Sequence, residues 1–395
     1  MLDTIRRAWM MRAFADHFEG APTIWVRAPG RVDLMGSHTD YNQGYVLTLP
    51  IDRDTWIAAR PRADDMVRVH SLNTESGSSW RLDAIARDRI APWTDYMRGV
   101  ASVLQAKGYA LTGCDSLVHS TIPLSSGLSS SAALEAATAM LFQALGEWAI
   151  ARVEMALLCQ RAENQFVGVN CGILDQYTSI LGEAGCVLLL DCRDLSSQPV
   201  TVPDGVRVVI CDTRAKRELA GSEYGERRAQ CEEGARLLAG FYPGVTALRD
   251  FTALRGVTAA QFAAHADDLP PVVARRCRFI IEENARVLAL AQALPALDRG
   301  AIRELTYASY AGARDLYEIG SAEMAAMMGA MASAPGVIGA RQAGGGFGGC
   351  MVAFVESAQV DTFEGHVRRA YAASTGRQPE VYPVQAAAGA GRLAE

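Results

Sequence analysis

Long apolar runs and paired cysteine motifs are both missing from this 395-residue sequence. No stretch of about 18 uninterrupted apolar residues occurs, so no segment is expected to span a membrane. The N-terminal segment carries charges inside an apolar pattern, which favours an amphipathic helix over a signal peptide. The nine cysteines are scattered singly, with no CxxC pair and no histidine cluster beside them. Free thiols are therefore expected rather than disulfides or a zinc site, and a reducing, cytoplasmic location follows.

An excess of positive charge is also lacking, because the formal net charge is -6. Bulk electrostatics therefore do not favour a nucleic-acid partner. An anionic small molecule such as a nucleotide would need a local cationic site or a metal ion. Repeats are absent, and half of the residues are hydrophobic. A chain of this length has room for about two to three domains with a sizeable core.

Strand-like and helix-like segments both occur in each half of the chain, which predicts an α+β fold rather than a parallel doubly wound sheet. The change in character near 200–215 predicts two domains, 1–205 and 206–395. Strands are expected at 23–28, 45–60, 66–70 and 115–122, within 185–213, on both sides of the glycines at 344–349, and at 381–385. Helices are expected at 93–108, after the Gly/Ser loop that follows residue 122, near 151–167, and through most of 224–334.

The segment PLSSGLSSSAALEAA, residues 123–137, places a Gly/Ser loop directly before a helix. The first turn of a helix has unpaired N–H groups and the positive end of the helix dipole, which suits a phosphate. Small residues let the backbone approach that phosphate, and a serine hydroxyl can ligate Mg²⁺. The alternative is an ordinary serine N-cap beside a glycine turn. The five serines favour phosphate binding, and the lack of a Walker A motif excludes a P-loop protein.

The segment GGGFGG, residues 344–349, contains the GxGxxG pattern of dinucleotide-binding folds. That interpretation is rejected because strand-like CMVAFV follows the glycines where a helix is required. A redox α/β enzyme is correspondingly disfavoured. The remaining alternatives are a flexible glycine hairpin and a glycine loop that passes close to a ligand.

Residues 30–44, GRVDLMGSHTDYNQG, run from a strand into a group of polar side chains. His38 and Asp40 can both bond a polyol, and Arg31 is a fixed cation at the strand end. A solvated surface turn is the alternative, and this segment alone does not decide between the two.

Together, in this order and spacing, the three motifs resemble those of the GHMP small-molecule kinases, and specifically the galactokinase branch. GR(V)NLIGEHTDYN is typical of the first motif in that family. Two further segments match it, NCGILDQYTSILGEAGCVLLLDCRDL and SEYGERRAQCEE, so the resemblance covers nearly the whole chain. It implies a ribosomal-protein-S5-like N-terminal domain, a ferredoxin-like C-terminal domain and an active site between them. The implied activity is ATP-dependent phosphorylation of the anomeric hydroxyl of a sugar.

The resemblance also implies roles for individual residues. Asp175 would be the catalytic carboxylate, with Arg31 beside it to keep it ionised and to offset charge on the transferred group. The sugar would be contacted by Ser37, His38, Asp40, Gly172 and Tyr224. ATP would be bound by Trp93 near the adenine and by the phosphate loop, Ser125, Ser126, Gly127, Leu128, Ser129, Ser130 and Ser131. Mg²⁺ would be bound by Ser131 and Glu163. Sugar and ATP would be the partners of a monomeric protein.

The sequence departs from the family pattern at Asp33, where Asn is usual, at Ala343, where Thr is common, and at Ser37, where galactokinases carry Glu. In the family this Glu accepts hydrogen bonds from the hydroxyl at carbon-6 of the sugar. Serine is short and neutral, so the pocket near carbon-6 is expected to be roomier and less anionic.

The substrate alternatives are therefore galactose and galactose-like sugars altered at carbon-6, namely galacturonate, L-arabinose and D-fucose. Ser37→Glu is expected to raise activity on galactose if the native sugar differs there. A sugar sensor without activity is disfavoured, because the phosphate loop, Asp175 and Arg31 are all present.

Overall fold

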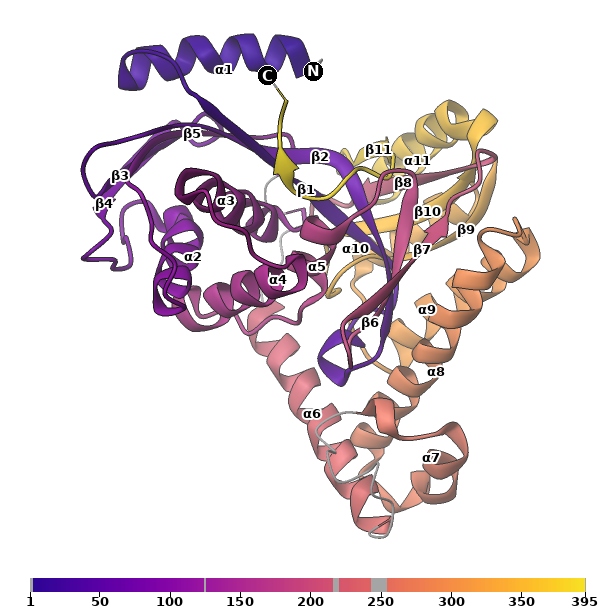
Figure 1. The fold of residues 1–395 in the computed structure, drawn as a ribbon. Coiled ribbons are helices and arrows are strands. Elements are labelled where there is room, and N and C mark those ends of the chain that lie inside the picture. The colour runs from indigo at the N-terminus through magenta and orange to yellow at the C-terminus, as the bar shows by residue number, and fades with distance from the viewer. Residues whose placement is uncertain (1–2, 124–125, 216–219, 243–253, 395) are drawn as a thin grey trace.

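The computed structural model describes residues 3–123, 126–215, 220–242 and 254–394, and it contains two β-sheets with helices packed against both (Figure 1). The first sheet has the strand order β12-β1-β2-β5-β3-β4. In addition, β6 pairs with β2 and with β7. Its strands are β1 (Ile24–Met35), β2 (Tyr45–Pro61), β3 (Met66–Ser71), β4 (Ser76–Arg81), β5 (Cys114–Ser120), β6 (Cys186–Asp191), β7 (Ser196–Thr201) and β12 (Gly391–Arg392).

Alternation along β2 gives this sheet two apolar faces. Ile57 points into a core with α2 (Asp95–Ala106), α3 (Ser130–Gly146), α4 (Arg152–Arg161) and α5 (Leu174–Leu181). Its neighbour Trp56 points to the opposite face, where it packs with Phe14 of the N-terminal helix α1 (Asp3–Phe18). The four helices of the first face bring the phosphate-loop segment and Asp175 to the sheet.

The second sheet has the order β11-β8-β10-β9. Its strands are β8 (Val206–Asp212), β9 (Val337–Gln342), β10 (Cys350–Glu356) and β11 (Glu380–Val384). One face packs on α10 (Ala322–Ala332) and α11 (Val360–Thr375). The other face shares a core with β1, β2 and the helices α8 (Pro271–Ala293) and α9 (Arg299–Asp315). The two sheets are therefore joined by one apolar layer rather than by a linker.

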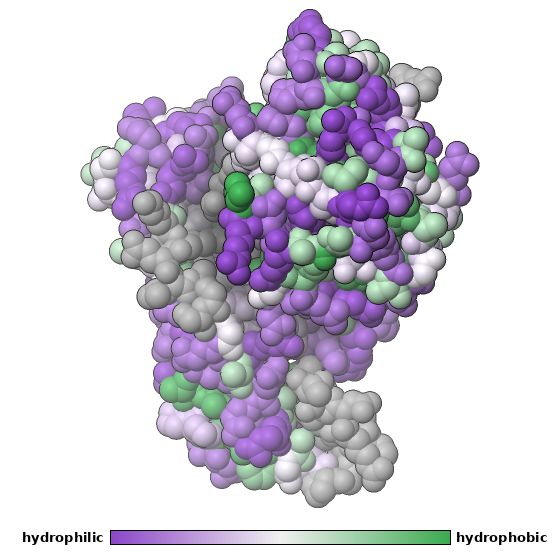
Figure 2. All heavy atoms as spheres, turned by 90° about the vertical axis from the view of Figure 1, so that its left-hand side faces the viewer, coloured by the Kyte–Doolittle hydropathy of each residue, from purple (hydrophilic) through white to green (hydrophobic). Residues whose placement is uncertain are grey.

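A separate helical cluster lies at the bottom of Figure 1, where α6 (Ala220–Phe241) and α7 (Ala259–His265) pack with α8. The face shown in Figure 2 is mostly hydrophilic, with apolar side chains in small scattered groups. None of the described helices is both long enough and apolar enough to cross a bilayer.

The α+β class expected from the sequence is confirmed, and the nine cysteines are all free. Within the described residues the expected strands and helices are present, including two strands that flank the 344–349 glycines, while residues 243–253 of the expected helical region lie outside them. The division into 1–205 and 206–395 stays a prediction. Pairing of β12 with Val26 and Arg27 of β1 crosses that division.

Candidate active site

A cleft of about 1390 Å³ lies where both sheets meet the phosphate-loop segment. It brings together nearly all the residues that the sequence singled out. Those lining it are Arg31, Ser37, His38, Asp40, Trp93, Gly127, Ser129, Ser130, Ser131, Glu163, Gly172, Asp175 and Tyr224. Ser125 lies outside the described residues.

Arg31 and Asp175 form an ion pair in this cleft. An irregularity in the β1–β2 pairing between Pro29 and Arg31 interrupts the ladder at this point, and the Arg31 N–H instead donates to the carbonyl of Leu128. The Arg31 guanidinium donates to Asp175 Oδ1 from Nε at 2.9 Å and from Nη2 at 2.5 Å. Burial lowers the pKa of Arg31, but the carboxylates of Asp175, Asp33 and Asp40 together raise it above its ordinary value. The cation therefore remains charged and fixed.

The second oxygen of Asp175 is also fixed. The Ser129 hydroxyl donates to Asp175 Oδ2 at 2.6 Å, and Arg31 Nη1 donates to the carbonyl of Gly127 at 2.9 Å. The phosphate loop and the carboxylate are thus held to each other directly. Asp175 lies in the first turn of α5, where the helix dipole favours an anion.

The phosphate loop reaches α3 through two residues with positive φ, Gly127 at 81° and Ser129 at 58°. The helix that follows begins at Ser130, so its unpaired N–H groups face the cleft side of the loop. Leu128 is buried, and the Ser126 hydroxyl donates to the carbonyl of Pro123. Neither residue lines the cleft, so the structure does not bring these two expected ATP contacts to it.

Ser131 and Glu163 are the expected Mg²⁺ ligands, and this role stays a prediction. Both line the cleft, and one oxygen of Glu163 accepts hydrogen bonds from Gln176 at 2.6 Å and from the thiol of Cys171 at 3.2 Å. Burial and nearby Asp175 raise the pKa of Glu163. A hydroxyl and a carboxylate suit a hard cation that takes its other ligands from water and phosphates. Within the described residues, no cluster of three or more His, Cys, Asp or Glu side chains could hold a metal without such help.

Asp40 and Gly172 meet at the sugar end of the cleft. A Cβ atom at Gly172 would overlap Asp40 Oδ2, so the glycine is required for the carboxylate to lie there. Burial raises the pKa of Asp40 to about 6. A half-buried carboxylate that lines the cleft gains by accepting hydrogen bonds from a ligand with several hydroxyls.

His38 adopts a positive φ of 66° and is held on both sides of its ring. Nε2 lies 3.0 Å from the Gly345 carbonyl, to which it must donate, and Nδ1 lies 2.8 Å from the hydroxyl of Tyr41. Burial lowers the pKa of His38 to about 4, so the ring is neutral. Both ring nitrogens are therefore engaged within the protein, and the geometry supports His38 as a tie to the glycine hairpin. Tyr224 packs against its ring, with centroids 5.1 Å apart.

Trp93 lies at another part of the cleft wall, and its indole N–H donates to the hydroxyl of Ser76 at 3.1 Å. Its indole is thereby fixed at the cleft wall. Contact with adenine stays a prediction.

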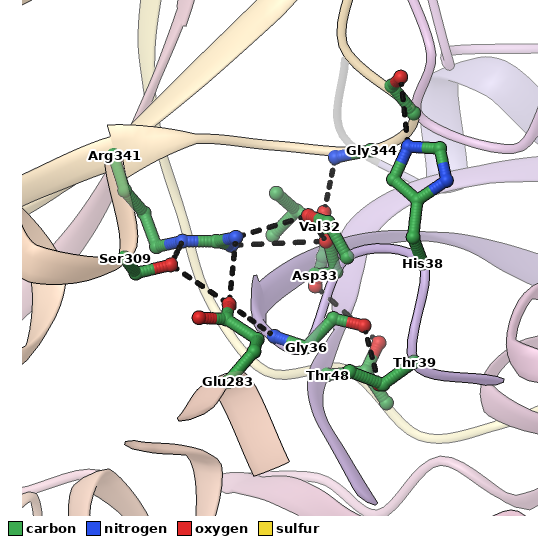
Figure 3. A network of polar contacts seen from close by, with 12 residues as sticks. Val32, Asp33, Gly36, His38, Thr39, Thr48, Glu283, Ser309, Arg341 and Gly344 are labelled. Atoms are coloured by element: carbon green, nitrogen blue, oxygen red, sulfur yellow. Dashed lines mark hydrogen bonds and ion pairs between the residues drawn. The ribbon is translucent and has the colours of Figure 1, made fainter. Parts of the chain in front are cut away.

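Asp33, Ser37 and Arg341 form a buried polar group beside the sugar end. Figure 3 shows the Arg341 side chain pointing toward Asp33. Ser37 donates to Asp33 Oδ2 at 2.6 Å, and the Gly344 N–H donates to Asp33 Oδ1. A carboxylate is thus present at the hydrogen-bonding partner of Ser37, and the expectation of a roomier, less anionic pocket near carbon-6 stays a prediction. Burial would raise the pKa of Asp33, but Arg341 and Arg31 outweigh it and lower that pKa.

Sequence reasoning missed Arg341 and Glu283, which complete this group. Arg341 is fully buried on β9 and donates to Ser309 at 3.0 Å, while Glu283 Oε1 accepts from Ser309 at 2.7 Å and from the Gly36 N–H at 3.2 Å (Figure 3). The available signal was a charged residue within an otherwise buried strand, which requires a partner.

Similarity to known proteins agrees with this geometry. The model described as galactokinase galactose-binding signature matches residues 12–61, and the model described as GHMP kinases N terminal domain matches residues 95–183. The galactokinase of Chloroflexus aggregans (strain MD-66 / DSM 9485) is 46% identical over 96% of this chain and 95% of that protein. The galactokinase of Roseiflexus sp. (strain RS-1) is 43% identical over 100% of this chain and 98% of that protein.

Solved structures give the same result. The crystal structure of Lactococcus lactis galactokinase complexed with galactose has a TM-score of 0.91 at 31% identity, covering 98% of this chain and 99% of that one. Methanococcus jannaschii mevalonate kinase has a TM-score of 0.62 at 14% identity, covering 93% and 99%, which shows a common fold alone.

The fold and the cleft define a GHMP kinase, with a Gly/Ser loop at the start of a buried helix and an Arg–Asp pair beside it. Full-length identity above 40% narrows the class further. The chain belongs to the galactokinase family.

Proposed function

We propose that this chain transfers the γ-phosphoryl group of ATP to the anomeric hydroxyl of galactose, which gives galactose 1-phosphate and ADP. The observation that carries the proposal is the Arg31–Asp175 pair, bonded to the phosphate loop through Ser129 and Gly127. It places a carboxylate and a fixed cation at the junction of the phosphate and sugar ends of one cleft.

Each residue has a role in this reaction. Asp175 takes the proton of the anomeric hydroxyl as the sugar oxygen bonds to phosphorus and the bond to ADP breaks. Arg31 orients Asp175 and offsets the charge that spreads over the transferred oxygens. Asp40 accepts sugar hydroxyls, with Gly172 giving it room and Tyr224 closing the wall. His38 keeps the glycine hairpin against the sugar end.

The phosphate loop binds ATP through its backbone N–H groups and the hydroxyls of Ser130 and Ser131, while Trp93 borders the adenine. Ser131 and Glu163 would hold Mg²⁺, which would neutralise charge on the phosphates. A monomeric, cytoplasmic enzyme is consistent with free cysteines throughout and with the absence of a membrane-crossing helix among the described residues.

The test is an ADP-release assay with ATP and Mg²⁺ over galactose, galacturonate, L-arabinose and D-fucose. Galactose is expected to give the highest kcat/KM, and the phosphorus spectrum of the product is expected to show an anomeric phosphate. A higher kcat/KM for galacturonate or for the pentose would overturn the assignment of the sugar. No ADP release with any sugar would overturn the kinase assignment itself.

A further inference from the structure

The hydroxyl of Ser37 has a fixed direction. A serine hydroxyl carries one proton and can accept two hydrogen bonds. Here the proton is donated to Asp33 at 2.6 Å, and the oxygen accepts from Arg341 Nη2 at 3.0 Å. Ser37 lines the cleft, so one remaining acceptor position of Oγ is what this side chain offers to a ligand. It has no second proton to offer.

Asp33 is what enforces this direction. Its side chain and that of Arg341 are 1% and 0% exposed, so neither can exchange its partner for water. Oδ1 accepts from the Gly344 N–H of the glycine hairpin, and Oδ2 lies 3.7 Å from Arg341 Nη1. An ionised carboxylate only accepts. As long as Asp33 is ionised, the Ser37 proton must point to it.

The buried cations of this group already have carboxylate partners. Arg341 pairs with both Asp33 and Glu283, and Arg286 pairs with Glu283 and with Glu282. A third carboxylate in this group would be left without a buried counter-ion, which is strongly unfavourable. The pocket wall therefore tolerates one carboxylate at the Asp33–Ser37 position, and this chain places it at Asp33.

We propose that Asp33 is a specificity-determining residue that acts through Ser37: it takes the one proton of Ser37 and leaves its Oγ only as an acceptor, which accepts a hydrogen bond from a sugar hydroxyl and offers no donor to a sugar carboxylate. This rests on the proposed function and names the group that separates galactose from its uronic acid. It reverses the expectation that a shorter, neutral residue at position 37 admits galacturonate.

The main test is Asp33→Asn, assayed with galactose and galacturonate. The asparagine amide donates to Ser37 Oγ, which frees the serine proton to point into the cleft and removes the negative charge. The kcat/KM for galactose is expected to fall roughly tenfold, the loss typical of one hydrogen bond to a charged group, mainly through a higher KM. The ratio of kcat/KM for galactose to that for galacturonate is expected to fall by at least the same factor.

The matched control is Asp115→Asn. Asp115 is equally buried and bonds to Arg60, Arg62 and Arg68, but it does not line the cleft. This variant is expected to lower the melting temperature while leaving the galactose-to-galacturonate ratio within twofold of the wild type. A change of the ratio in this control equal to that in Asp33→Asn would overturn the proposal, because loss of any buried carboxylate would then suffice.

A second test moves the carboxylate. Ser37→Glu alone adds the unbalanced third charge and is expected to lower kcat/KM for galactose more than tenfold or to prevent folding. Asp33→Asn with Ser37→Glu restores one carboxylate at the wall, and its kcat/KM is expected to exceed that of Ser37→Glu at least tenfold, with the preference for galactose retained. This non-additivity is the signature of coupled residues.

Two outcomes overturn the proposal while leaving the function intact. One is a wild type that phosphorylates galactose but whose sugar preference is unchanged by Asp33→Asn. The other is a Ser37→Glu variant that is more active on galactose than the wild type in the presence of Asp33. A wild type that releases no ADP with galactose instead contradicts the proposed function.

Discussion

Arg31 and Asp33 lie two residues apart on β1, and each forms an ion pair with a distant part of the chain. The partner of Arg31 is Asp175, whose side chain is 27% exposed in the cleft. The partner of Asp33 is Arg341, whose side chain has no exposure. In the first pair, Arg31–Asp175, a substrate can reach the carboxylate, and we call it the open pair. The second pair, Asp33–Arg341, is excluded from solvent and can only hold its neighbours in place, and we call it the dry pair. One strand thus carries both a reacting pair and a positioning pair, and access to the cleft separates their roles.

Breaking the open pair is expected to have the largest effect. Asp175→Asn keeps the size of the side chain and its bond to Ser129 but removes the proton acceptor. The kcat is expected to fall by about a thousandfold, within the range for loss of a general base, with the melting temperature nearly unchanged. Turnover equal to that of the wild type in a coupled ADP assay would contradict the assigned role.

Breaking the dry pair is expected to affect stability first. Arg341→Met leaves Asp33 and Glu283 buried with less counter-charge, and the free energy of unfolding is expected to fall by about 3–5 kcal/mol. Chemical denaturation measures this.

The control for that experiment is Arg68→Met. This arginine is 41% exposed and pairs with Asp115, so the expected loss is below about 1 kcal/mol. Equal losses in the two variants would show that burial does not distinguish the pairs.

Removing the hydrogen bond between the open pair and the phosphate loop is expected to lower kcat by a smaller factor. Ser129→Ala removes the hydrogen bond to Asp175 Oδ2, and kcat is expected to fall roughly tenfold, as for one bond to a charged group. The KM for galactose is expected to change little, because Asp40 is untouched. A change confined to the KM for galactose would place Ser129 with the sugar instead of with the catalytic carboxylate.

The pH dependence is expected to be the mildest effect. Burial raises the pKa of Asp40 to about 6, so the carboxylate gains a proton as the pH falls through 6 and loses acceptor capacity for the sugar. The kcat/KM for galactose is expected to halve near pH 6 and to fall about tenfold for each further pH unit. His38 stays neutral across this range, since burial lowers its pKa to about 4. A flat kcat/KM profile down to pH 5 would contradict this role of Asp40.

The sequence predicted the open pair but not the dry one, for a physical reason. Arg31 lies in the polar motif at a strand end, and the resemblance of residues 170–195 to the family implied Asp175 as its neighbour. The partners of Asp33 depend on how the two sheets pack, which no local pattern along β1 or β9 specifies. Secondary structure could be predicted because strand alternation and turn glycines are local properties of the sequence. The Asp33–Arg341 pair is not a local property, so it could not.

His38 shows a second limit of sequence reasoning. Its motif suggests a sugar contact, yet both ring nitrogens bond within the protein. The sequence cannot reveal this, because the Gly345 carbonyl comes from a hairpin of the second sheet. His38 does line the cleft, but its hydrogen-bond partners, which decide its role there, come from the fold.

The pairing of β12 with β1 also constrains how the protein is made. A ribosome that has released residues 1–205 has delivered seven strands of the first sheet, but not Gly391–Arg392, which pair with Val26 and Arg27 at its edge. The strand that carries Arg31 and Asp33 therefore stays uncovered on that edge through most of synthesis, and pairings this distant in sequence form slowly. A nascent chain is expected to gain sugar binding late, after residue 392 has emerged, and an unpaired β1 edge is the segment that a chaperone would have to shield until then.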